Sequence, residues 1–119
     1  MAVYAGLGDC TDPVVAVAES DLESADRRVL AMLAAKGIDA SLVVSAAGLA
    51  LLRDYAVQVA TALAAQRGAV EPDSPLWKKR DAARDAAKEW AALIDRESLG
   101  LAAAGTGTAG YASIPLGRA

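Results

Sequence analysis

The third helical segment of this chain, together with the glycine-rich stretch behind it, limits most strongly what the chain can fold into. Ser74 is a residue type that caps helices, and Pro75 is favoured at the first helical position, so we expect a helix to begin there. The helical pattern continues through Ile94 to Ser98. The Ala, Gly and Thr residues that follow Leu101 have the composition of a linker. The sequence therefore predicts a helical body followed by an extended arm.

A first helix is predicted well before this segment. Ser20 and Glu23 have the spacing of a capping box, which indicates a helix start, and Gly37 indicates its end. Apolar residues recur on one face of this segment at helical spacing: Leu22, Ala25, Val29 and Leu33. This face should pack against the rest of the body.

A second helix should begin between Ser41 and Ser45, since either residue could cap it, and run to Arg67 before Gly68. It is apolar nearly all round, and a helix of this kind is buried nearly all round. It is therefore either the central element of a bundle or a face that contacts a neighbouring copy.

These patterns predict an all-α protein, a small bundle of three main helices with an extended, Gly-rich C-terminal arm. We expect an N-terminal segment at 1–19 whose order the pattern leaves open, a helical domain at 20–98 and a flexible arm at 99–119. Alanine supplies much of the 55% hydrophobic content and Phe is absent, so each buried contact removes little apolar surface from water. Such a core often depends on partners or on oligomerisation.

The composition argues against catalysis. The chain has no histidine and a single cysteine, Cys10, so the commonest general base, the usual triads and the usual zinc ligands are missing. Asp81 and Asp85 have no sign of a desolvated cleft around them. We therefore expect no enzyme activity, and no catalytic, cofactor-binding or metal-binding residues. The apolar runs are broken by charge and no basic signal region precedes them, which favours a protein of the cytoplasm without a membrane partner.

Two charged rows run along the third helix beside its apolar face. The residues that could form a subunit interface there are Trp77, the basic row Arg80, Arg84 and Lys88, and the acidic row Asp81, Asp85 and Glu89. One interpretation is a solvated face with weak pairs such as Asp81–Arg84 and Asp85–Lys88. The other is a ring contact, in which the basic row of one copy meets the acidic row of the next. Trp77 is either a cation–π partner of a nearby arginine or an interface anchor.

Nucleic acid is a less favoured partner for this helix. The net charge is −3, and the interleaved carboxylates should repel phosphate.

The arm contains apolar residues that are unusual for a purely solvated end: Tyr111, Ile114, Pro115 and Leu116. Extended segments with such side chains can dock on a sheet edge or in a groove of a partner, while the glycines provide reach. A disordered end is the other interpretation.

Four stretches of the chain, within roughly residues 18–101, carry a resemblance to a known family: Ser20-Asp-Leu-Glu-Ser-Ala-Asp26, Leu51-Leu-Arg-Asp-Tyr-Ala56, Lys88-Glu-Trp-Ala-Ala-Leu-Ile94 and Leu99-Gly-Leu101. Together they resemble the small head–tail connector (adaptor) proteins of tailed bacteriophages. The resemblance rests on helix pattern and composition.

The resemblance implies a structural virion protein, made in the host cytoplasm, that forms a ring of commonly twelve copies between the capsid portal and the tail. DNA passes through such a ring without specific binding, and a stopper or tail-completion protein follows on the far side. The residues Tyr111, Ile114, Pro115 and Leu116 would then dock on the portal protein. An acidic chain suits a channel in which DNA slides.

Two other functions remain open. The chain could be a cytoplasmic helical protein-interaction module, a chaperone- or antitoxin-like dimer that uses the second helix as its interface. It could also be a DNA-binding regulator that uses the third helix, with an affinity that falls steeply with salt.

Overall fold

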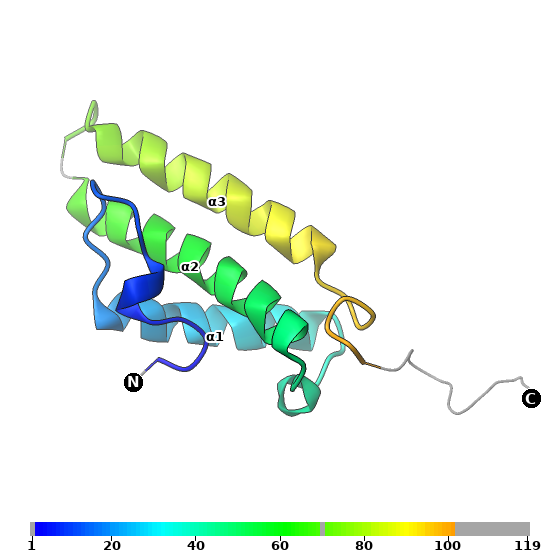
Figure 1. Cartoon of the computed structure of the whole chain (residues 1–119). Coiled ribbons are helices and arrows are strands. Elements are labelled where there is room, and N and C mark those ends of the chain that lie inside the picture. The colour runs from blue at the N-terminus through cyan, green and yellow to red at the C-terminus, as the bar shows by residue number, and fades with distance from the viewer. Residues whose placement is uncertain (1, 70, 102–119) are drawn as a thin grey trace, which may run out of the picture.

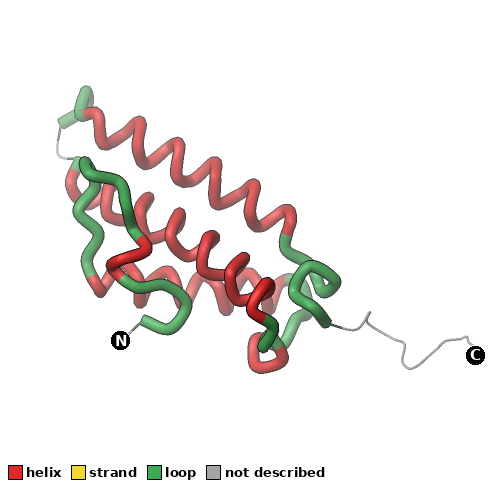
Figure 2. The backbone as a smooth tube through the Cα atoms, in the orientation of Figure 1, coloured by secondary structure: helices red, strands yellow, loops and turns green. Residues whose placement is uncertain are grey.

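The computed structural model describes residues 2–69 and 71–101. These residues form three α-helices and two short 3-10 turns, and the described part contains no strand (Figures 1 and 2). The prediction of an all-α helical bundle is confirmed. The elements are η1 (Leu7–Asp9), α1 (Glu19–Ala35), η2 (Ala40–Leu42), α2 (Ala46–Gly68) and α3 (Pro75–Leu93).

The starts of α2 and α3 follow their local capping signals. The side chain of Ser45 accepts a hydrogen bond from the backbone N–H of Gly48 at 3.0 Å, so the later of the two possible starts of α2 is the one used. Ser74 accepts from the N–H of Leu76 at 3.3 Å, and Pro75 is the first residue of α3. The start of α3 was predicted from a side chain that satisfies otherwise unpaired N–H groups, and for α2 the same signal left Ser41 and Ser45 as alternatives.

The start of α1 was predicted wrongly. The helix begins at Glu19, and its capping position is Ala18 rather than Ser20. The carboxylate of Asp21 accepts a hydrogen bond from the N–H of Ala18 at 2.9 Å. Asp21 therefore has the role that the pattern gave to Glu23, and the helix starts earlier.

The end of α3 also differs from the prediction, since the helix ends at Leu93 and not at Ser98. Ile94 is extended, and Asp95 and Ser98 then close a turn through paired hydrogen bonds of 2.8 and 2.7 Å. This turn brings both Ile94 and Leu99 into the core with no exposed surface. Burial of two large apolar side chains on one side explains why the helix does not continue.

The helix α2 lies between α1 and α3 (Figure 1). It packs against both, whereas α1 and α3 have no comparable contact with each other. The main core contains Leu22, Val29 and Leu33 of α1 and Leu52 and Ala56 of α2. The apolar second helix was predicted to be either the central helix of a bundle or a face that contacts a neighbouring copy, and in the structure it is the central helix.

The segment before α1 covers part of this bundle. The backbone N–H groups of Val3 and Tyr4 donate to the carboxylate of Asp26 at 2.7 and 3.1 Å. Ala5 is buried in the main core, and Val15 packs on the end of α2. Residues 2–18 are therefore packed on the same body as the three helices.

Candidate functional site

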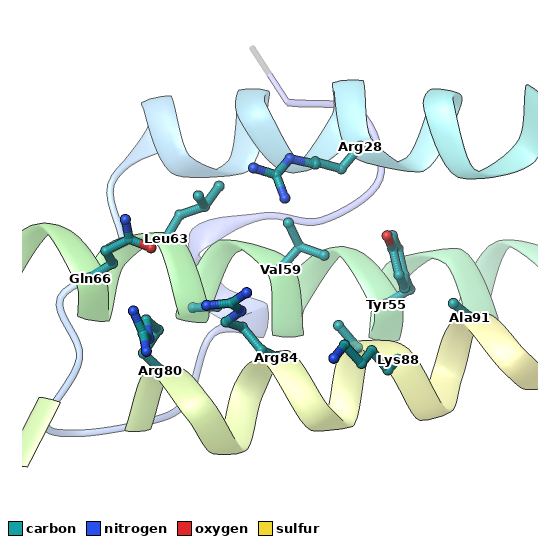
Figure 3. Close-up of a pocket in the computed structure, with 11 residues that line it drawn as sticks. Arg28, Tyr55, Val59, Leu63, Gln66, Arg80, Arg84, Lys88 and Ala91 are labelled. Atoms are coloured by element: carbon teal, nitrogen blue, oxygen red, sulfur yellow. The ribbon is translucent and has the colours of Figure 1, made fainter. Parts of the chain in front are cut away.

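A groove of about 500 Å³ lies between α1 and α3, with α2 as its floor (Figure 3). The floor residues recur every three or four positions along α2, which places them on one face of the helix. They are Tyr55, Val59, Ala62, Leu63 and Gln66. Val57, which lines a second pocket together with Gly8 and Asp9 of the N-terminal segment, lies on the opposite face of α2.

The floor is apolar at its centre and carries a phenol at one end. Val59 and Ala62 are buried, while Tyr55 and Leu63 are half-buried. Burial raises the pKa of Tyr55, and the positive charge of Arg28 acts in the opposite direction. At neutral pH the phenol is therefore protonated and can donate a hydrogen bond.

Four cationic side chains surround this floor. Arg80, Arg84 and Lys88 come from successive turns of α3, and Arg28 comes from α1 on the other side (Figure 3). No carboxylate lines the groove, whose lining lies wholly within the described residues. The groove is therefore a positively charged surface on a chain with a net charge of −3.

The four cations differ in how they are held. Arg80 donates two hydrogen bonds to Asp81, at 3.0 and 2.8 Å, and its guanidinium lies 4.7 Å from the centre of the Trp77 ring. The other three cations are exposed, and none has a hydrogen bond or ion pair to the residues in 2–69 and 71–101; they are Arg28, Arg84 and Lys88. Three positive charges therefore face the groove without a neutralising partner among the residues that the structure describes.

The acidic row of α3 lies outside the groove. At about 100° per residue, these positions are centred opposite Ala83 and Ala87, which are buried against the body. The acidic side chains, Asp81, Asp85 and Glu89, are exposed. The predicted pairs Asp81–Arg84 and Asp85–Lys88 are not formed within the described part of the chain. The structure thus places the two charged rows on different sides of α3, and only the first residues of the rows, Arg80 and Asp81, are paired with each other within the described residues.

Trp77 contacts Arg80 as one of its two predicted roles requires. Its indole N–H also donates to the carbonyl of Glu71 at 2.7 Å, which ties the start of α3 to the loop before it. Its role as an interface anchor stays a prediction.

The sequence predicted the basic row but not the whole site. Arg28 and Tyr55 were missed because no local pattern connects α1 and α2 to that row. The predicted portal-docking residues lie outside the described residues; they are Tyr111, Ile114, Pro115 and Leu116.

No group of His, Cys, Asp and Glu side chains within residues 2–69 and 71–101 is arranged to hold a metal ion. None of the helices in the described part combines the length and apolar character needed to cross a membrane.

Comparison of the chain with models of protein families, with curated proteins and with solved structures gave no match.

Proposed function

We propose that this chain is a non-enzymatic structural subunit that works by docking, and that its assembly is the head–tail connector of a tailed bacteriophage. Copies would form a ring, twelve by family resemblance, between the portal protein and a stopper or tail-completion protein. The protein would be made in the host cytoplasm and end in the virion, with DNA passing through the ring. The observation that supports this most is the separation of the two charged rows on α3.

A closed ring requires two different and complementary surfaces on each copy. The basic row faces the groove and the acidic row faces away from the body, so one copy offers both surfaces at once. Both rows step by four residues, which corresponds to about 6 Å along a helix, so their charges can align over two turns. Complementary charge of this kind sets register and partner choice more than raw affinity.

The arm supplies the second half of the proposal. Tyr111, Ile114 and Leu116 would dock on the portal, with the glycines from residue 105 onward giving reach. The net charge of −3 would let DNA slide through the ring, because the chain as a whole does not attract phosphate.

Complementary charge reversal tests the subunit contact. One variant carries Asp85→Lys and Glu89→Lys, and the other carries Arg84→Glu and Lys88→Glu. Each variant alone should be missing from purified particles, since its reversed row meets a row of the same sign. Supplying both variants together should restore incorporation, because each reversed row then meets its complement. The matched control is Glu71→Lys with Asp73→Lys, two exposed acids in the loop before α3.

Normal incorporation of either reversed variant on its own would show that the rows do not join the copies. Where a variant is absent from particles, circular dichroism separates the loss of the subunit contact from misfolding. Cross-linking of the native assembly, followed by mass spectrometry, identifies the neighbours. Portal and tail components support the connector.

A single soluble partner in the cross-linking experiment would instead favour the helical interaction module. A partner that uses the second helix could contact it at the groove, where Tyr55 and Leu63 of α2 are half-buried.

A further inference from the structure

We propose that the groove between α1 and α3 is a binding site for a multivalent oxyanion of the phosphate class, held by Arg28, Arg84 and Lys88. This goes beyond docking between copies, because it gives the groove a ligand of its own. That ligand would compete with a neighbouring acidic row for the same cations.

The first argument is the charge of the groove. Arg28 reaches it from α1, and Arg84 and Lys88 reach it from α3, with no hydrogen bond or ion pair to the residues in 2–69 and 71–101 (Figure 3). Like charges on facing walls repel, and a concave surface of one sign concentrates the potential above it. A bound anion would relieve this repulsion.

The second argument is the type of donor. A guanidinium presents a planar fork that matches two oxygens of a phosphate, and an ammonium supplies a point charge. Two arginines on opposite walls, together with Lys88 one turn along α3 from Arg84, can contact several oxygens of one oligophosphate. Tyr55 and Gln66, at the two ends of the floor, add neutral donors.

The third argument is the position of the carboxylates. Interleaved acids along α3 should repel phosphate, but the structure places that row on the face away from the body. On α1, Asp26 lies two positions before Arg28, and this spacing places it on another side of the helix. There it binds the N–H groups of Val3 and Tyr4. These carboxylates therefore lie away from the groove, where they repel a bound phosphate less than the sequence alone suggests.

The size of the groove agrees with such a ligand. A volume of about 500 Å³ lies within the range of small-ligand sites in proteins, which is roughly 300–1,000 Å³. Its open side lets a longer chain of phosphates pass through. The phosphate chemistry can come from two sources, a free oligophosphate or the backbone of a nucleic acid, and these can be separated by experiment.

The test is a titration of the ¹⁵N-labelled full chain, followed by amide shifts at low salt. One arm uses tripolyphosphate alone and the other uses a short oligothymidine. We expect saturable shifts at the groove-lining residues, and a roughly tenfold weaker affinity in each of Arg28→Gln, Arg84→Gln and Lys88→Gln. In the oligothymidine arm, each loss should also reduce the slope of log affinity against log salt by about 0.7 for each phosphate contact removed.

Lys78→Gln is the matched control, because Lys78 is exposed on the same helix and does not line the groove. Binding in both arms supports the site, and groove-dependent binding of the oligothymidine alone assigns the phosphate to a nucleic-acid backbone. No saturable shift with either probe up to about 10 mM would overturn the site, since a specific multivalent contact binds more tightly than this. Equal weakening by Lys78→Gln would overturn it too.

The isolated chain can be titrated whether or not copies assemble. Failure of this site therefore leaves the charge-reversal test of the ring contact unaffected, and failure of the ring contact leaves this site intact.

Discussion

Gly48 lies in the first turn of α2, directly against the turn that follows α3. A Cβ atom at this position would lie 2.8 Å from the carbonyl oxygen of Leu99 and 2.9 Å from the hydroxyl of Ser45. The same hydroxyl donates to that carbonyl at 3.1 Å, so the three groups form one tight contact between distant segments. The absence of a side chain at residue 48 is therefore required by tertiary packing.

Gly48→Ala should lower the free energy of unfolding by about 1–2 kcal/mol, as measured by urea denaturation. Alanine in a helix normally adds up to about 1 kcal/mol over glycine, so a loss means that the clash outweighs the helix propensity. Gly8→Ala is the control, because a Cβ there meets nothing within 4 Å. An unchanged or higher stability of Gly48→Ala would show that the turn after α3 yields easily.

At the scale of elements, one guanidinium joins the end of α2 to the start of α1. Arg67 pairs with the carboxylate of Asp21 and donates to the carbonyl of Ala16 at 3.0 Å. Asp21 in turn caps α1, and its side chain is only 9% exposed. Removing the guanidinium would leave a mostly buried carboxylate without its cation.

Arg67→Ala should lower the free energy of unfolding by about 1–3 kcal/mol, toward the lower end because half of the Arg67 side chain is in solvent. Arg67→Lys should recover only part of this, since an ammonium cannot contact both acceptors in the same way. Arg53→Ala is the matched control on α2, an exposed arginine 3.7 Å from Asp54, with an expected loss below about 0.5 kcal/mol. Equal losses at the two arginines would contradict the tie between α1 and α2.

At the scale of the whole molecule, the packed body extends to Leu101 and so includes residues 99–101 of the segment that was predicted as a flexible arm. Leu99 is fully buried, and Leu101 packs against the same core. Residues 105–119 should therefore be dispensable for folding of the body, and under the proposed function they are required for docking.

Deletion of residues 105–119 should leave the helical circular dichroism and the thermal midpoint of the body unchanged within about 2 °C. The shortened chain should fail to enter particles. A clearly lower thermal midpoint would show that residues 105–119 stabilise the body. Normal entry of the shortened chain into particles would contradict the docking role. Substituting Tyr111, Ile114 and Leu116 by Ser in the full-length chain separates docking side chains from arm length.

The starts and ends of the helices differ in how well the sequence predicted them. Ser45 and Ser74 cap their helices through bonds to N–H groups two or three residues away. Local sequence was therefore sufficient for the start of α3, whereas for α2 it left Ser41 and Ser45 as alternatives. The start of α1 and the end of α3 depend on distant contacts. Asp21 is held by Arg67 from α2, and the turn after Ile94 is held by packing on α2. Local patterns contain no information about these partners.

The sequence by itself determined that the chain is helical, that α2 is apolar on nearly every side, and that α3 carries a basic and an acidic row. Side-chain periodicity along one element is sufficient for those conclusions. Only the tertiary structure decided that the basic row faces a groove, that Arg28 and Tyr55 complete it, and that the acidic row points away. Periodicity defines the faces of a helix, but which faces meet depends on how three helices and residues 2–18 pack together.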